Sequence, residues 1–127
     1  MAMNRYRPMA LFREELRHFL HRSETAARAV GITPRQHLLL LQIAGSEGGT
    51  TTVSDLVQKL ALTQSAVTEL VQRAEQAGLV ARTQSADDGR VVNLSLTETG
   101  ASRLEDITGS LDAERAHLRE ILKGLEP

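Results

Sequence analysis

The sequence predicts a mainly α-helical fold with one small β-hairpin, and three observations support this prediction. Apolar residues recur at helical spacing in the first and last parts of the 127-residue chain. Two short helical segments, 55–61 and 64–77, are joined by a very short turn, as in a helix-turn-helix unit. Two strand-like segments, 79–83 and 91–96, follow directly. A helix-turn-helix followed by a two-stranded hairpin is a winged helix-turn-helix.

Two predicted helices precede this unit. Apolar residues form a stripe along residues 9–30, and Gly31 can end that helix because glycine adopts positive φ easily. Thr33 and Pro34 are typical of a helix start, since proline needs no N–H partner in the first turn. The segment HLLLLQIA that follows is apolar on most sides, which predicts a buried central helix. Residues 46–51, SEGGTT, are expected to form a polar loop.

Threonines mark the starts of the remaining helices. Thr52, followed three positions later by Asp55, resembles a capping box, and Thr63 can cap the second helix of the helix-turn-helix. Thr97 is expected to cap one last helix that runs nearly to residue 127. Leucines recur there every seven residues with isoleucines three positions further on, which predicts a coiled-coil-like seam. The seam consists of Leu104, Ile107, Leu111, Leu118, Ile121 and Leu125.

Composition excludes several classes of protein. The chain has no cysteine, which rules out disulfides, thiolate nucleophiles and cysteine-based zinc sites. The N-terminal segment has no signal-like apolar region, and the longest apolar run is Leu38 to Leu41, so we expect a cytoplasmic protein with no membrane partner. Glycine-rich phosphate loops, HExxH motifs and nucleophile–base pairs are also lacking, so we expect no catalysis and no cofactor.

The histidines and aromatic residues narrow the choice further. His18 and His21 lie one helical turn apart but lack a complete ligand set, so ordinary surface or interface histidines are favoured over a metal site. The aromatic residues are Tyr6, Phe12 and Phe19, too few for a base-stacking platform. Any contact with nucleic acid must therefore depend on a helix placed in a groove.

The second helix of the helix-turn-helix is the candidate for that role. Gln64, Ser65 and Thr68 lie in its first turn and a half, where short polar side chains can reach base edges or phosphates. Ser54 in the preceding helix and Arg73 further along are candidates for phosphate contacts. The alternative is an ordinary polar helix surface, since small polar residues also suit helix starts.

The hairpin tip, SADDGR, is the more specific signal. An arginine on a wing can enter a neighbouring minor groove, where the negative potential is concentrated. Asp88, two residues before Arg90, is expected to hold the guanidinium in a fork and so aim it, while Gly89 permits the turn. The alternative is a solvated turn with an incidental pair of charges.

The segment from Thr52 to Gly100 resembles the multiple antibiotic resistance regulator (MarR) family of winged-helix transcription factors. The resemblance rests on AGLVAR, on the D-x-R of the hairpin tip, on LSLTETG and on the earlier GITPRQHLLLLQIA. It implies a single domain over residues 1–127, with dimerisation helices at 9–30 and 98–125 and a DNA-binding lobe at 34–97. It also implies that Gln64, Ser65, Thr68, Asp88 and Arg90 occupy positions that serve DNA binding in the family.

The resemblance further implies a homodimer that binds a pseudo-palindromic promoter site. The residues themselves agree, because the apolar stripe and the seam offer more apolar surface than a small monomer buries easily. The residues expected at the dimer interface are Phe12, Leu16, Phe19, Leu104, Leu111, Leu118, Ile121 and Leu125.

One residue departs from the family pattern. Glu69 stands where a basic or neutral contact is common, so it either reads a cytosine amino group or weakens binding. Residues 54–97 carry four basic and five acidic side chains, and Arg35 is expected to supply part of the missing positive charge.

We therefore expect a homodimeric repressor that binds double-stranded DNA and is relieved by a small-molecule effector of unknown identity. The alternative is a winged-helix protein-interaction module with weak or no DNA binding.

Overall fold

The computed structural model describes residues 2–126. The chain divides into two compact units. The helical unit contains the residues up to Gly31 and those from Asp106 on, and the winged unit contains Ile32–Glu105. The α5 helix, Glu98–Ser110, begins in the winged unit and ends in the helical unit.

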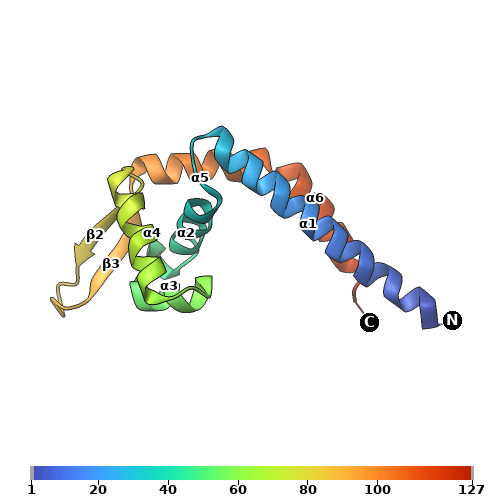
Figure 1. Ribbon diagram of the computed structural model, residues 1–127, viewed down its shortest axis with the longest axis horizontal. Coiled ribbons are helices and arrows are strands. Elements are labelled where there is room, and N and C mark those ends of the chain that lie inside the picture. The colour runs from blue at the N-terminus through green and yellow to red at the C-terminus, as the bar shows by residue number, and fades with distance from the viewer. Residues whose placement is uncertain (1, 127) are drawn as a thin grey trace. The chain divides into compact units, whose positions relative to one another are not determined.

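The helical unit is built on two long helices. A short 3-10 turn, η1 (Ala2–Arg5), leads into α1 (Tyr6–Ala29), and α6 (Asp112–Lys123) packs along α1. The two helices run in opposite directions, so both chain termini lie at the same end of this unit (Figure 1). The predicted end of the first helix is confirmed, since Gly31 adopts a φ of 77°.

The prediction of one uninterrupted C-terminal helix is wrong at Leu111. This residue has φ −108° and ψ 10°, outside the helical range, and it separates α5 from α6. Ser110 Oγ donates to the carbonyl of Ile107 at 2.9 Å, and Arg115 Nη1 donates to the carbonyl of Thr108 at 3.1 Å. In an unbroken helix these two carbonyls would accept the backbone N–H groups four residues later, so side-chain competition accounts for the break.

The winged unit contains the three helices that the sequence predicts. They are α2 (Pro34–Ala44), α3 (Val53–Leu60) and α4 (Gln64–Gln76). All three predicted caps are confirmed, because each capping threonine hydroxyl accepts the backbone N–H three residues later at 3.1–3.2 Å. These threonines are Thr33, Thr52 and Thr63.

The turn between α3 and α4 depends on one unusual backbone conformation. Ala61 has a φ of 53°, in the left-handed region, and this allows the chain to reverse within two residues. The N–H of Leu62 then reaches the carbonyl of Val57 at 3.3 Å. The short turn fixes α4 against α3 and so sets the direction of the second helix.

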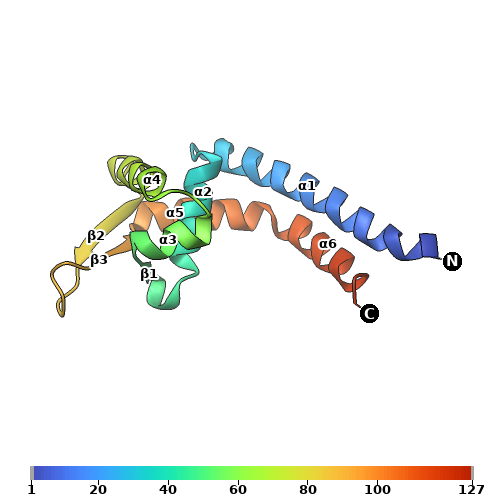
Figure 2. The same cartoon turned by 60° about the horizontal axis from the view of Figure 1, so that its bottom comes forward.

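The sheet has one strand more than the predicted hairpin. β2 (Val80–Gln84) and β3 (Val92–Leu96) pair in antiparallel fashion, and β1 (Thr50–Thr51) pairs with the other edge of β3. The prediction of a loop over residues 46–51 is therefore wrong at its end, where Thr50 lies opposite Ser95. Figure 2 labels β1 beside the start of α3. A 3-10 turn, η2 (Glu47–Gly49), precedes this short strand.

The core of the winged unit lies between the helices and the sheet. The buried central helix is confirmed for one face of α2, whereas Leu38 and Leu41 on its other face are 48% and 45% exposed. The largest fully buried side chains of this unit are Leu39, Leu40, Ile43, Leu56, Val67, Val71 and Leu94.

The start of α5 fits closely against the turn before β2. Thr97 Oγ1 donates to the carbonyl of Gly78 at 2.6 Å and accepts the N–H of Gly100 at 3.0 Å. The N–H of Thr97 donates to the carbonyl of Leu79 at 3.0 Å. A Cβ on Gly100 would lie 2.1 Å from that same carbonyl oxygen, so only glycine fits here without displacement. This contact explains the Thr and Gly of the LSLTETG segment.

Candidate nucleic-acid interface

The α4 helix presents a polar face at its N-terminal end. Val67 and Val71 are fully buried and fix which side of the helix faces the core. Gln64 and Ser65 are exposed and Thr68 is half-buried, so the three predicted contact residues are available on the outer side of the first turns. A helix held in this way can offer its N-terminal side chains to base edges in a major groove.

The structure brings Arg35, Glu69 and Arg73 together. Arg73 Nη2 donates to Glu69 Oε1 at 2.7 Å, and both side chains are more than 60% exposed. Arg35, from the first turn of α2, lines the same shallow hollow of about 210 Å³. The Glu69 carboxylate thus pairs with Arg73, and with Arg35 in the same hollow the three side chains have one excess positive charge. An exposed pair of this kind contributes little to stability.

The hairpin tip orders its own backbone. Asp88 Oδ1 accepts the N–H of Arg90 at 3.0 Å, whereas the guanidinium Nε is 3.5 Å away. The expected fork does not form, because a carboxylate two residues earlier in a tight turn reaches the backbone amide first. The Arg90 side chain remains 94% exposed. Asp88 therefore shapes the turn from which Arg90 projects.

Further contacts hold the loop around this turn. The backbone of Ser85 donates to the carbonyl of Val91 at 2.8 Å, and Gln84 Nε2 donates to the carbonyl of Gly89 at 2.9 Å. The hairpin projects from the helices of the winged unit (Figure 1), so its exposed tip is accessible to a partner.

A hollow of about 410 Å³ separates the start of α3 from the wing. Ser54 lines it from α3, and Arg82 and Arg90 line it from the wing. Arg82 Nε also donates to Glu75 Oε1 at 2.6 Å, which ties β2 to the last turn of α4. Two guanidinium groups beside a helix N-terminus, where backbone N–H groups lack helical partners, form an environment suited to an anion such as phosphate.

Sequence reasoning missed Arg82. The residue lies in a predicted strand, and its relevance depends on strand pairing that brings it opposite Leu94 and toward α3. Strand alternation in the sequence gives the two faces of β2, but it does not say which face the start of α3 approaches.

The predicted dimerisation residues have different environments. Leu104 and Leu111 are 9% and 4% exposed and thus already buried within one chain. The other six, Phe12, Leu16, Phe19, Leu118, Ile121 and Leu125, are half-buried. Apolar side chains that do remain open on the helical unit are Tyr6, Met9, Leu11, Leu20 and Leu122, between 41% and 50% exposed.

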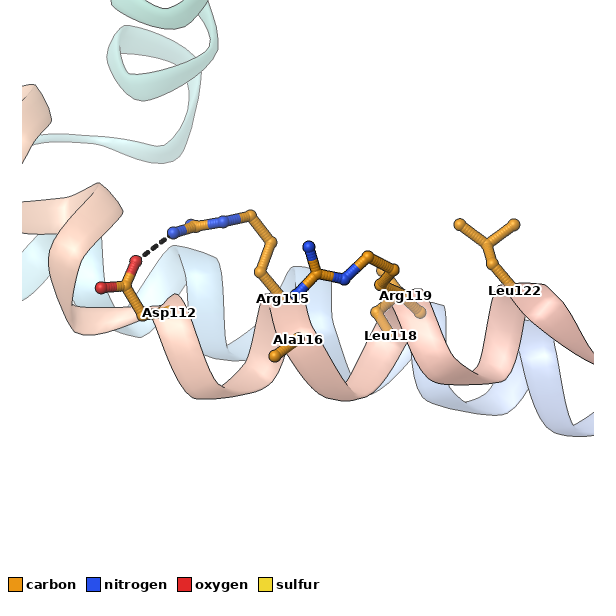
Figure 3. A pocket seen from close by; sticks show the side chains of 6 residues that line it. All are labelled: Asp112, Arg115, Ala116, Leu118, Arg119 and Leu122. Carbon is orange, nitrogen blue, oxygen red and sulfur yellow. Dashed lines mark hydrogen bonds and ion pairs between the residues drawn. The ribbon is translucent and has the colours of Figure 1, made fainter.

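One outer side of α6 forms an open groove of about 540 Å³. Figure 3 shows Arg115, Arg119 and Leu122 along this side, with Asp112 in an ion pair with Arg115. The groove combines cationic and apolar side chains on a surface that the chain itself leaves open.

The histidines are dispersed. His18 and His21 are exposed on α1, while His117 Nε2 lies 3.3 Å from Glu15 Oε2. Within residues 2–126, no three His, Asp or Glu side chains gather closely enough to hold a metal ion. Among these residues, no helix is both long enough and apolar enough to cross a membrane.

Comparison with known proteins places these features in a family. The family model described as MarR family matches residues 30–91. The chain is 34% identical over 92 residues to the HTH-type transcriptional repressor MdtR of Bacillus subtilis, a match that covers 72% of this chain and 58% of MdtR. It is 37% identical over 100 residues to the organic hydroperoxide resistance transcriptional regulator of the same organism, covering 76% and 67%.

Among solved structures, the fold is similar to that of a variant of S. aureus MepR bound to an oligodeoxyribonucleotide. The TM-score is 0.73 at 24% identity, over 88% of this chain and 81% of MepR. The chain thus spans less than two thirds of the length of MdtR and about two thirds of the hydroperoxide regulator. The winged unit and these matches together show that the chain belongs to the MarR family of winged-helix transcriptional regulators.

Proposed function

We propose that this protein binds double-stranded DNA as a homodimer and represses a promoter with a pseudo-palindromic site. The observation that carries the proposal is the arrangement of the winged unit. The polar N-terminal face of α4 and the 94% exposed Arg90 belong to the same compact unit, in which the Arg82–Glu75 pair joins the wing to α4. The MepR structure bound to an oligodeoxyribonucleotide supports this use of the fold.

Each part of the surface has a proposed role. Gln64, Ser65 and Thr68 contact base edges in the major groove, and Arg90 enters the adjacent minor groove. Ser54 and Arg82 bind a phosphate in the hollow between α3 and the wing. Arg35 and Arg73 contact the backbone beside the recognition helix, and Asp88 maintains the shape of the wing tip.

The pairing of Glu69 bears on its role. Because its carboxylate accepts a hydrogen bond from Arg73, Glu69 restrains that guanidinium and its charge is locally balanced. We propose that it positions Arg73 for a phosphate and is tolerated at this site. An unpaired acid at position 69 would favour a protein-interaction module over DNA binding, so the pairing with Arg73 weakens that alternative.

The second copy is proposed to dock on the helical unit. Tyr6, Met9 and Leu20 lie on one side of α1, each at least 44% exposed, Leu122 on α6 is 47% exposed, and the open groove of α6 adjoins Leu122. Isologous contact of these faces would bury apolar surface that a monomer leaves in water. Binding to two successive major grooves requires such a dimer to hold its two recognition helices about 34 Å apart.

We propose that a small-molecule effector lowers DNA affinity by changing the separation of the two recognition helices. A ligand with different affinities for the two spacings would shift the population toward the non-binding form.

The test is fluorescence anisotropy with DNA fragments from upstream of the protein's own gene, at several salt concentrations. Arg90→Ala should weaken specific binding about tenfold or more and lower the salt slope by roughly one. Arg28→Ala is the matched control, because Arg28 is an exposed arginine whose partner, Glu24, is 3.9 Å away on the same helix. If a random-sequence selection also yields no preferred DNA, the proposal is wrong and the interaction-module alternative stands.

The homodimer needs its own test by sedimentation equilibrium. Leu122→Glu should shift the protein toward monomer, whereas Leu38→Glu, at a similarly exposed leucine of the winged unit, should not. A wild-type protein that remains monomeric at high micromolar concentration would refute the dimer.

A further inference from the structure

A second open hollow, here called the cavity, lies on the surface of the helical unit, and Leu111 is the one buried residue of its lining. It has a volume of about 350 Å³, between the C-terminal part of α1 and the junction of α5 with α6. Ala26, Ala29, Val30 and Leu111 supply apolar walls, and five polar or charged side chains complete the lining. The volume lies in the range of small-molecule sites in proteins.

The two hydroxyls in the cavity can only accept hydrogen bonds from a ligand. Thr25 Oγ1 donates to the carbonyl of His21 at 3.2 Å, and Ser110 Oγ donates to the carbonyl of Ile107 at 2.9 Å. A hydroxyl has one proton, so both protons are committed to the helix backbone. Thr25 and Ser110 therefore present only lone pairs to the space between them.

The charged groups add further acceptors. Asp106 and Glu114 line the cavity, and Glu114 Oε2 is buried with no hydrogen-bond partner among the described residues. Arg22 is the one side chain of the lining that can donate from a cationic group. The lining thus contains two carboxylates and two hydroxyl acceptors but one guanidinium donor. A buried carboxylate oxygen without a donor is costly, and a ligand that donates to it would remove that cost.

We propose that this cavity binds a small organic cation, with an amidinium or protonated amine toward Asp106 and Glu114 and an apolar body against Ala29, Val30 and Leu111. The donors of such a group match the excess of acceptors, and its charge matches the excess of carboxylates. The surface proposed for the second copy uses other side chains, from Tyr6 to Leu20 on α1 and Leu122 on α6.

The cavity lies at the α5–α6 junction, so a ligand bound in it would contact both helices. Asp106 and Ser110 belong to α5, Glu114 belongs to α6, and the break at Leu111 lies between them. A cation that binds both carboxylates would favour one geometry of this break. We assign the cation as the effector of the proposed regulator, and this part rests on the proposed function.

The experiment is isothermal titration calorimetry of the full chain with benzamidinium and with benzoate, which are similar in size and opposite in charge. Benzamidinium should bind once per chain and at least about tenfold more tightly than benzoate. Glu114→Gln should weaken benzamidinium about tenfold, and Arg22→Gln should strengthen it. The matched control is Glu105→Gln, because Glu105 is an exposed acid of α5 outside the cavity.

Several results would overturn the proposal. The first is that benzamidinium does not bind at millimolar concentration. The second is that benzoate binds as tightly as benzamidinium. The third is that Glu114→Gln leaves the affinity for benzamidinium unchanged. Asp106→Asn gives a second measure if Glu114→Gln fails to fold, as judged by circular dichroism.

Anisotropy with and without saturating benzamidinium separates this inference from the proposed function. Specific DNA binding without cation binding refutes the cation site alone, and cation binding without specific DNA binding refutes the regulator alone. If the protein binds both specific DNA and benzamidinium, but benzamidinium leaves the DNA affinity unchanged, the cation is not the effector.

Discussion

Replacing Gly100 by alanine should destabilise the winged unit, and the structure gives the size of the effect. The new Cβ would lie 2.1 Å from the carbonyl oxygen of Leu79, whereas real contacts of this kind begin near 3.0 Å. The first turn of α5 must therefore move by about 1 Å. That movement stretches the bonds from Thr97 to the carbonyls of Gly78 and Leu79, now 2.6 and 3.0 Å long.

The substitution changes the free energy of unfolding in opposite directions. Overpacking against backbone costs about 1–3 kcal/mol, and each weakened hydrogen bond costs about 1 kcal/mol. The higher helix propensity of alanine stabilises the helix by at most about 1 kcal/mol. We therefore expect Gly100→Ala to lower the free energy of unfolding by about 2 kcal/mol or more.

Gly109 in the same helix is the matched control. A Cβ built there meets no atom within 4 Å, so Gly109→Ala should instead stabilise the protein by about 0.5–1 kcal/mol. Urea unfolding followed by circular dichroism measures both variants through their midpoints and slopes. If the two substitutions shift the midpoint in the same direction, the steric reasoning is refuted.

Three further predictions concern the backbone turns and pH dependence. Ala61→Gly should raise the free energy of unfolding by about 0.5–1 kcal/mol, because φ 53° strains alanine and suits glycine; a lower urea midpoint would contradict this. Asp88→Asn should leave the wing as resistant to limited proteolysis as the wild type, because an amide oxygen still accepts the Arg90 N–H. Asp88→Ala removes this acceptor and should be cut faster. If both variants are cut faster than the wild type at the same rate, the charge of Asp88, and not its hydrogen bond, orders the turn. Burial lowers the pKa of His37 below 6.5, so the unfolded chain binds more protons and stability is lost as the pH falls from about 7 to about 5. His37→Gln should show a shallower fall over that range, and an unchanged slope would show that other groups control it.

The helix boundaries could be predicted because their signals are local. Thr33, Thr52 and Thr63 each bond to an amide three residues away, so the residue type and the spacing contain all that is needed. The exposed polar start of α4 also follows from the sequence, since the buried Val67 and Val71 fix the opposite face.

Other features depended on three-dimensional geometry that the sequence pattern does not contain. The strand at Thr50–Thr51 exists because β3 leaves an edge open to it, and SEGGTT carries no strand signal of its own. The aspartate of the wing was expected to bind the guanidinium, but the turn geometry placed the backbone amide of Arg90 nearer to it. The pair of Arg82 with Glu75 joins β2 to α4, so it became visible only in the tertiary structure.

The sequence by itself determined the first four helices and the hairpin, the helix caps, the winged helix-turn-helix and the resemblance to a regulator family, because each depends on periodicity or on short spacings. The tertiary structure alone decided where the long C-terminal helix breaks, which leucines of its seam are buried within one chain and which acids and hydroxyls line the cavity beside Leu111. These depend on competition for particular carbonyls and on packing between α1 and α6. Such competition is settled by distances in space, which residue spacing along the chain does not specify.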